Sequence, residues 1–224
     1  VIAGSHAGVS VGPDGATHQA IEDIAIMRPI ANMTVLVPAD AHEARKATIA
    51  AALLPGPVYI RLAREKTPLF TTPETPFEVG KAYEVWRSEG SPSHGSGRLQ
   101  PQVSIIACGS LVHNALLAAA ELEKKGVKVV VINNHTVKPM DEETIIASAR
   151  ETGAVVTVEE HQVMGGMGSA VAEVLCKNYP VPMEFVGVQN QFGESGSPAE
   201  LLEKFGMGVK SIMEAVQRAI TRKR

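Results

Sequence analysis

Three side chains that are able to transfer protons or accept hydrogen bonds lie close together near the beginning of the chain. His6, Asp14 and His18 stand in a segment rich in glycine. Histidine titrates near neutral pH, and glycine allows a ligand to approach the main chain closely. Because the segment has no apolar period, we predict the rim of an active site, followed by a helix that starts near Thr17 or His18.

Each of these residues also has an ordinary structural explanation when it is taken alone. His6 fits a loop, Asp14 before glycine is a common turn pair, and His18 fits a helix cap. Their order within a glycine-rich frame favours a site. We expect the following Glu22 and Asp23 to be solvated or to contact another subunit rather than to act as catalysts.

The composition of the chain is that of an ordinary globular protein. It has 224 residues, of which 45% are hydrophobic and 20% charged, with a net charge of −3. This length suits one large domain or two small ones. No basic face and no long apolar run is visible, so we expect neither nucleic acid nor a membrane as a partner. Cys108 and Cys176 lie in apolar stretches, which predicts buried free thiols in a reducing, cytoplasmic compartment.

The amino-terminal block predicts only a part of an α/β domain. Strands are predicted at 35–38 and 57–62, and a helix at 41–53. Asp40 is placed to cap that helix, with Glu43 as its partner in a capping box. So few strands would leave sheet edges open. We therefore expect the chain to start in the middle of a domain, and the rest to come from a preceding segment or another chain.

A second unit follows a proline- and threonine-rich linker at 64–78. Predicted strands lie at 77–88, 103–107, 127–132, 154–158 and 182–188, and predicted helices at 110–125, 141–151, 169–178 and twice near the end, with a glycine-rich loop at 90–102. Repeated strand–helix units predict a doubly wound α/β domain with a mostly parallel sheet. We place the first domain at 1–72, the linker proper at 73–78 and the second domain at 79–224.

The run S-H-A-G-V-S-V-G-P-D-G-A-T-H-Q-A-I-E-D, residues 5–23, resembles the pyrimidine-binding domain of transketolases. Segments 32–40 and 59–64 extend the resemblance, which continues more loosely to the end of the chain. Transketolases move a two-carbon ketol unit between sugar phosphates with thiamine diphosphate, a reaction of the pentose phosphate pathway. The resemblance implies the C-terminal portion of such an enzyme, namely the end of a pyrimidine-binding domain and the transketolase C-terminal domain.

The resemblance also implies roles for individual residues. His6 would contact the sugar near its phosphate or hydroxyl groups, and Asp14 would accept a hydrogen bond from the hydroxyl that sets donor stereochemistry. His18 would lie near the ketol end of the donor and assist proton transfer, so that His18 and His6 are the catalytic candidates. All three would also bind substrate.

Arg64 matches the phosphate-binding arginine of the family, although Ala63 stands where serine is usual. A guanidinium group can bind phosphate through two parallel hydrogen bonds. Arg61 is the less favoured candidate for this role. The plain alternative is a surface arginine paired with Glu65 or another nearby acid.

The second unit contains one further motif, in which Val158-Glu159-Glu160-His161 is followed by the turn Gly165–Gly168. Doubly wound sheets bind ligands at such places, and a helix amino end attracts anions. We favour a structural or interface role and keep an anion or regulatory site as the alternative. His113 and His135 are interpreted as a helix-surface and a loop residue.

The resemblance requires groups that this sequence lacks. Thiamine diphosphate needs an activating carboxylate, stacking aromatic rings, and Mg²⁺ or Ca²⁺ on oxygen ligands. The family supplies the metal site from a G-D-G…N segment in a separate domain, and Pro13-Asp14-Gly15 is not that segment. We thus expect no cofactor-binding or metal-binding residue here. Activity would require an N-terminal transketolase segment or subunit, in a homodimeric or heterotetrameric assembly.

Two other classes of function remain open. A β-type subunit of a 2-oxoacid dehydrogenase, or a fragment of 1-deoxyxylulose-5-phosphate synthase, would share the architecture and the cofactor. A non-catalytic binding module is the other possibility. The H-A-G…P-D-G-x-T-H-Q run and the arginine after the strand at 57–62 favour transketolase over both.

Overall fold

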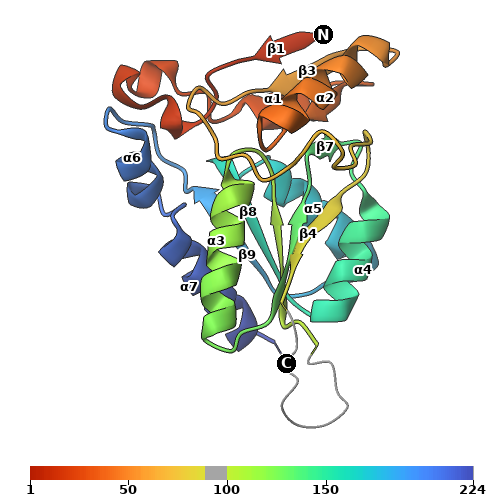
Figure 1. Ribbon diagram of the computed structural model, residues 1–224, viewed down its shortest axis with the longest axis vertical. Helices are drawn as coiled ribbons and strands as arrows, with labels where there is room; N and C mark the ends of the chain where they lie inside the picture. Colours follow the sequence, from red (N-terminus) through yellow and green to blue (C-terminus); the bar gives the residue numbers. More distant parts are fainter. Residues whose placement is uncertain (89–99, 224) are drawn as a thin grey trace.

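The computed structural model describes residues 1–88 and 100–223, and shows two sheets stacked end to end. Most of the predicted loop at 90–102 lies outside the described residues. The smaller sheet has the strand order β1-β3-β2-β7 and the larger one the order β4-β6-β5-β8-β9. Figure 1 shows the amino-terminal block covering one end of the larger, helix-flanked sheet.

The smaller sheet combines strands from both halves of the chain. Its elements are β1 (Ile2–Gly4), the 3₁₀ helices η1 (Val9–Asp14) and η2 (Ala16–His18), α1 (Asp23–Met27), β2 (Thr34–Leu36), α2 (Ala41–Leu53), β3 (Val58–Arg61) and β7 (Thr136–Lys138). β1 and β2 both pair with β3 in parallel. β7, which the sequence pattern did not predict, pairs antiparallel with β2. The two units therefore share one sheet, and the domain boundaries at 72 and 79 stay a prediction.

The larger sheet confirms the doubly wound α/β domain. Its elements are β4 (Tyr83–Arg87), β5 (Val103–Ala107), α3 (Leu111–Lys124), β6 (Val129–Asn133), α4 (Glu142–Thr152), β8 (Val155–Gln162), α5 (Met167–Asn178), β9 (Met183–Val188), α6 (Pro198–Lys204) and α7 (Val209–Thr221). β6, β5, β8 and β9 are parallel, and only the edge strand β4 is antiparallel.

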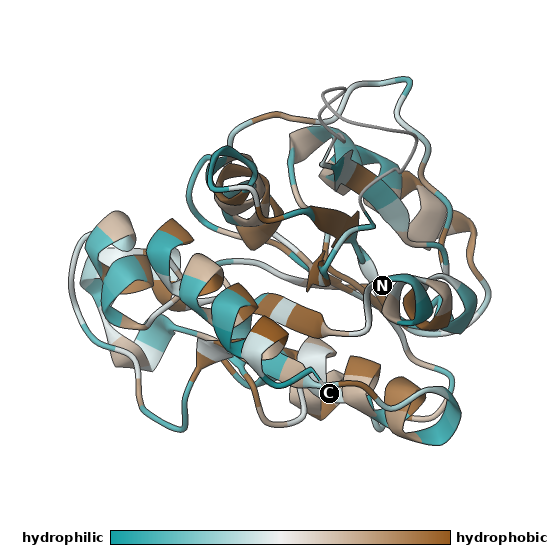
Figure 2. Cartoon of the chain, turned by 90° about the horizontal axis from the view of Figure 1, so that it is seen from below, coloured by the Kyte–Doolittle hydropathy of each residue, from teal (hydrophilic) through white to brown (hydrophobic). Residues whose placement is uncertain are grey.

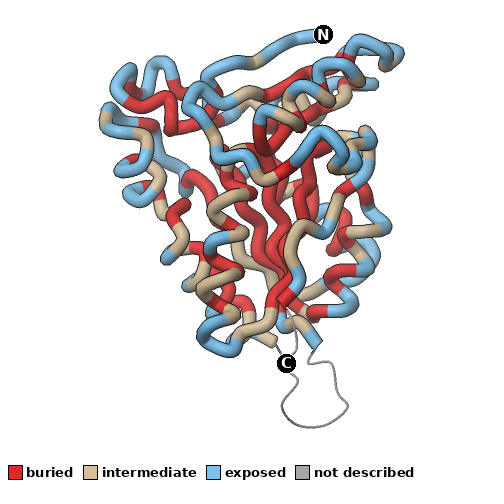
Figure 3. Tube along the Cα trace, viewed as in Figure 1, coloured by how far each residue is buried: buried red, intermediate tan, exposed pale blue. Residues whose placement is uncertain are grey.

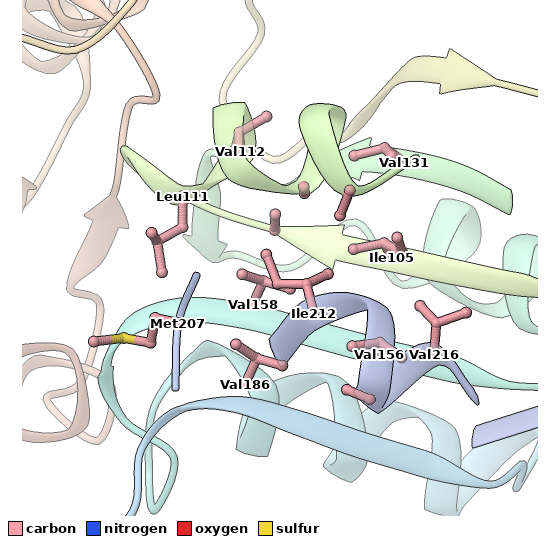
Figure 4. Close-up of a cluster of buried hydrophobic side chains, with 14 of the residues drawn as sticks. Ile105, Leu111, Val112, Val131, Val156, Val158, Val186, Met207, Ile212 and Val216 are labelled. Carbon is pink, nitrogen blue, oxygen red and sulfur yellow. The ribbon is translucent and has the colours of Figure 1, made fainter. Parts of the chain in front are cut away.

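Helices cover both faces of this sheet, so its strands β5, β6 and β8 are buried along almost their whole length (Figure 3). α3 and α7 pack on one face, where Ile105, Val156 and Ile212 share a core (Figure 4). α4 and α5 pack on the other face. Seen from below, hydrophobic strands lie between helices that carry both hydrophilic and hydrophobic residues (Figure 2). Such a continuous apolar strand run is typical of parallel sheets covered on both sides.

The linker has no helix or strand between β3 and β4, yet it is attached to the domain at two helix starts. Asp40 caps α2 by accepting the Glu43 N–H at 3.1 Å, and also accepts the Thr71 N–H at 2.8 Å. The Glu43 carboxylate accepts the Ala39 N–H at 2.9 Å rather than the N–H of the cap residue Asp40, so only the Asp40 half of the predicted capping box forms. Asp141 caps α4 and accepts the Ala82 N–H at 3.0 Å.

One expectation about a single residue was wrong. Cys176 is exposed, because it lies on the outer side of α5 while Val174 and Leu175 point inward. His135 lies in the loop between β6 and β7, as predicted, and is fully buried there, with its ring stacked on Phe77 at a centroid distance of 4.2 Å. Cys108 is buried as predicted.

Candidate active site

Two neighbouring parallel strands bring the first and the last of the candidate residues to one sheet edge. His6 follows the carboxyl end of β1, and Arg64 follows the carboxyl end of β3. The register pairs Gly4 with Arg61, and the Ala7 N–H donates to the Leu62 carbonyl at 3.1 Å. The carboxyl ends of parallel strands are where α/β sheets commonly bind ligands.

Asp14 and His18 lie on a loop that leaves this edge and returns to it. The base of the loop closes where the Gly8 N–H donates to the Ala20 carbonyl at 2.8 Å. Gly12 and Gly15 have φ angles of +82° and +78°, which interrupt regular helix. The predicted helix near Thr17 is therefore wrong: the loop consists of two short 3₁₀ turns, and α1 begins only at Asp23.

Arg64 closes over the loop and contacts Asp14. Its Nη1 donates to the Asp14 Oδ2 at 2.5 Å and to the Val11 carbonyl at 3.0 Å. The pair is well exposed, with 36% of the Arg64 side chain and 43% of the Asp14 side chain open to solvent. Two of the four candidate residues thus form one contact.

The two histidines are exposed at the same end of the molecule's smaller sheet. His18 Nδ1 lies 3.0 Å from the Thr17 hydroxyl, and His6 has a φ of +58°. Across residues 1–88 and 100–223, neither imidazole has a hydrogen bond to Asp14 or Arg64. The structure places the four candidates around one loop and sheet edge without joining them in one hydrogen-bonded set.

Arg61 has a structural role beneath the loop. Its Nε donates to the Asp23 Oδ2 at 2.8 Å, and its Nη2 donates to the carbonyls of Ala20 and Glu160 at 3.1 and 2.8 Å. The side chains of Arg61 and Asp23 are only 7% and 11% exposed. The alternative of Arg61 as the phosphate-binding residue is therefore wrong, because its donors face the protein interior.

Asp23 is mostly enclosed, with 11% of its side chain exposed, rather than solvated, while a subunit contact stays a prediction. Burial by itself would raise the pKa of the Asp23 carboxyl. The charge of Arg61, with hydrogen bonds from Arg61 and the Tyr59 hydroxyl, outweighs burial and lowers that pKa. A buried carboxylate with a guanidinium partner stays ionised, and so fixes α1 onto β3.

Glu160 supports the loop from the second unit. Its Oε1 accepts the Ser10 N–H at 2.6 Å, and its Oε2 accepts the Ser110 hydroxyl at 3.0 Å. Burial raises the pKa of Glu160. Gly8 has a φ of +91°, and a Cβ there would lie 2.2 Å from Oε1. Glycine is required at this position because the carboxylate passes directly beneath the main chain.

Glu159 explains the glycine-rich turn before α5. Its two oxygens accept the N–H groups of Met167 and Gly168 at 2.7 and 2.8 Å. A Cβ on Gly166 would lie 2.2 Å from the same carboxylate. Burial raises the pKa of Glu159 to about 7, although both N–H groups oppose the shift. The protein's own carboxylate occupies the helix amino end, so the alternative of an anion site there is wrong.

His161 joins the second unit to α1. Its Nε2 accepts the N–H of Ile24 at 3.1 Å, so the proton is on Nδ1, which lies 2.6 Å from the Gln162 carbonyl. Burial and the charge of Arg61 lower the pKa of His161 to about 4. The imidazole must be neutral for its Nε2 to accept the Ile24 N–H in the first turn of α1.

No metal site is formed by the part of the chain that the structure describes: no group of three or more His, Cys, Asp or Glu side chains has a suitable arrangement. No helix among the same residues is long and apolar enough to cross a membrane.

Two family models match the chain in the order of the two units. Residues 1–68 match the transketolase pyrimidine-binding domain, and residues 97–212 match the transketolase C-terminal domain. The chain belongs to the transketolase family. This confirms the resemblance seen in the loop, and with it the α/β architecture of a partial pyrimidine-binding domain followed by a C-terminal domain.

Individual relatives agree with this assignment. The chain is 43% identical over 220 residues to the 6-deoxy-6-sulfo-D-fructose transketolase subunit SqwH of Clostridium sp. (strain MSTE9), covering 98% of this chain and 65% of that subunit. It is 36% identical to the transketolase of Homo sapiens, covering 99% of this chain and 34% of that enzyme. A solved split gene transketolase, described as an inactive β4 tetramer, matches at 45% identity and a TM-score of 0.88, covering 100% of this chain and 67% of that one. The chain thus spans between about one third and two thirds of these relatives.

Sequence reasoning missed the buried groups that hold the site. Glu160, Arg61 and Gln19 each connect the loop to another part of the fold. The run V-E-E-H was the available signal, since two acids and a histidine directly after an apolar strand require partners when buried. Nothing in the local sequence named the loop as their partner.

Proposed function

We propose that this chain is the C-terminal part of a transketolase that transfers a two-carbon ketol unit from a ketose phosphate to an aldose phosphate. The observation that carries the proposal is the contact between Asp14 and Arg64 at the carboxyl edge of β1 and β3. It combines a hydroxyl-accepting carboxylate with an anion-binding guanidinium on the loop that the family uses for substrate.

The free hydrogen-bonding groups of these residues suit a sugar phosphate. All hydrogen bonds of Arg64 within the described residues leave from Nη1, so Nε and Nη2 can bind a phosphate. Asp14 accepts a substrate hydroxyl with its second oxygen. His6 and His18 are exposed and can move protons to and from substrate oxygens.

Thiamine diphosphate would supply the carbanion-stabilising chemistry of the reaction. We propose that the cofactor and its Mg²⁺ or Ca²⁺ are held mainly by a diphosphate-binding domain on an N-terminal segment or a partner subunit. The assembly would be homodimeric or heterotetrameric, and this chain alone would be inactive. The free thiols of Cys108 and Cys176 support a reducing, cytoplasmic location.

A sulfonated ketose is a second candidate donor. The Clostridium relative, 43% identical, is named for 6-deoxy-6-sulfo-D-fructose. A sulfonate presents three anionic oxygens much as a phosphate does, so the free donors of Arg64 would bind either group.

The test is ketol transfer from xylulose 5-phosphate to ribose 5-phosphate with thiamine diphosphate and Mg²⁺. The chain is assayed alone and together with the polypeptide that carries the diphosphate-binding domain. We expect activity only in the mixture. Inactivity of the mixture with this donor and with 6-deoxy-6-sulfo-D-fructose would overturn the proposal, and activity of the chain alone would overturn the need for a partner. Preference for the sulfonated donor would select the second candidate.

A further inference from the structure

Gln19 connects the candidate-site loop to a distant segment of the C-terminal domain. The residue directly follows His18, and its side chain is buried, with 6% of the residue exposed. Its Nε2 donates to the Val9 carbonyl at 3.0 Å and to the Glu194 carbonyl at 2.8 Å, and lies 3.4 Å from the Gly12 carbonyl. One side-chain amide therefore bridges both ends of η1 and the segment 193–196.

The surrounding backbone is fitted closely to this amide. A Cβ on Gly193 would lie 1.7 Å from the Gln19 Oε1, so the main chain of the C-terminal segment lies directly against the carboxamide. A Cβ on Gly15 would lie 2.5 Å from the Ser195 hydroxyl oxygen, and one on Gly12 would lie 3.2 Å from Pro198. The loop and the segment 193–198 thus fit together without room for added side chains.

We infer that Gln19 is a positioning residue that makes the placement of Asp14 and His18 depend on the C-terminal domain. All three partners of its Nε2 are carbonyl oxygens, so only a donor fits there. Asp14 and His18 flank the turn at Gly15, whose backbone hydrogen bonds run from Gly15 to Gly12 and from His18 to Gly15. Without the amide, this turn would keep its local backbone hydrogen bonds and the contacts of Arg64 with Asp14 and Val11, but would lose its side-chain link to the segment 193–196.

The chemistry of the position distinguishes Gln from its nearest isostere. Glutamate has the same shape but no N–H, and would direct a carboxylate oxygen at the carbonyls of Val9 and Glu194. A buried polar group without a partner costs more than the hydrogen bond it replaces. Methionine fills the same volume without a polar atom and removes only the tether.

The functional part of this inference rests on the proposed transketolase activity, whereas the structural part does not. The variants are Gln19→Glu and Gln19→Met, and the matched control is Gln162→Glu. Gln162 holds the neighbouring part of the same segment, donating to the Gln191 carbonyl at 2.8 Å, and does not contact the loop. If Gln19→Glu does not fold, Gln19→Met still decides the question.

The first readout is amide hydrogen exchange over residues 7–20, measured on this chain together with its partner polypeptide. We expect at least about tenfold faster exchange at Gly15 and His18 in both Gln19 variants, with the core strand β5 unchanged. Unchanged exchange would overturn the inference, whether or not the assembly is active.

The second readout is steady-state kinetics of the same assemblies. A displacement of about 1 Å in a positioning group can cost about 100-fold, so we expect kcat/KM for the ketose to fall by about 10- to 100-fold, with a raised KM. A purely structural role would lower kcat through a smaller folded fraction and leave KM unchanged. Faster exchange with an unchanged KM would overturn the positioning role, and a raised KM in Gln162→Glu would overturn its specificity. Inactivity of the unmodified assembly would count against the proposed function alone.

Discussion

The exposed pair of Asp14 and Arg64 and the buried pair of Asp23 and Arg61 contain the same two residue types, and the two arginines lie only three positions apart at the end of β3. Both are carboxylate–guanidinium pairs near the carboxyl edge of the smaller sheet. Arg61 donates to Asp23 and to carbonyls from both units, whereas Nε and Nη2 of Arg64 have no partner among residues 1–88 and 100–223. Residue type alone therefore does not distinguish a site from its support, but the direction of the unused donors does.

The largest effect that tests this comparison is on the free energy of unfolding. Arg61→Met leaves the Asp23 carboxylate buried without its partner, and breaking such a pair costs about 3–5 kcal/mol. Arg64→Met removes an exposed pair and should cost at most about 1 kcal/mol. Urea unfolding of both variants measures the difference.

The double variant Asp23→Leu with Arg61→Met is the control for this first experiment. It removes both charges and should recover part of the lost stability. Equal destabilisation by the two single arginine variants would contradict the distinction between support and site.

An effect of intermediate size is the pH dependence of stability that the buried His135 causes. Burial lowers the pKa of His135 to about 4, from an ordinary value of 6.5. Its Nε2 has no hydrogen-bond partner in the described part of the chain, and its ring stacks on Phe77. Between pH 6.5 and about 4 the unfolded state binds the proton and the folded state does not, so His135 contributes less stability as pH falls.

His135→Phe should therefore raise stability, and by more in acid. The gain should grow by about 1.4 kcal/mol for each pH unit below 6.5, down to about pH 4. Chemical denaturation at pH 7.5 and 5.5 measures this growth. A pH-independent gain in His135→Phe would show that this imidazole does not stay neutral in the fold.

The smallest expected effect is the loss of stability when the exposed cap of α6 is removed. Ser197 begins α6 with a capping box, in which its side chain accepts the Glu200 N–H. Ser197→Ala should lower stability by about 1 kcal/mol, and Ser197→Asp should retain it because the acceptor remains. Thermal melting of both variants is sufficient. Equal loss in both would indicate that the hydroxyl matters for a reason other than capping.

Local patterns were sufficient where structure depends on near neighbours. The helix at 41–53 and the strand at 103–107 begin and end where the sequence predicted. Their signals are a capping aspartate at 40 and a continuous β-branched and apolar run, and both act within a few residues. The strand predicted at 77–88 is shorter, Tyr83–Arg87, because its pairing with β6 begins only at Tyr83.

The loop of the candidate site was harder to predict, for a physical reason. His6, Asp14 and His18 were identified by residue type within a glycine-rich run and Arg64 by the family resemblance, and the structure places them around one edge. The expected helix at Thr17 failed, because Gln19 uses its side chain to hold Val9 and Glu194. A hydrogen bond across 175 positions leaves no local trace.

The sequence by itself determined the family, the order of the two units, the alternation of strands and helices, and the residues of the candidate site. The elements follow from periodicity and caps, and the family and the candidate residues follow from a glycine-framed run of polar residues and its resemblance to transketolases. Only the tertiary structure decided which charged groups are support. Asp23, Arg61, Glu159, Glu160 and His161 find their partners across the boundary between the units or at a helix start. Burial and distance, which a linear pattern does not contain, assign them that role.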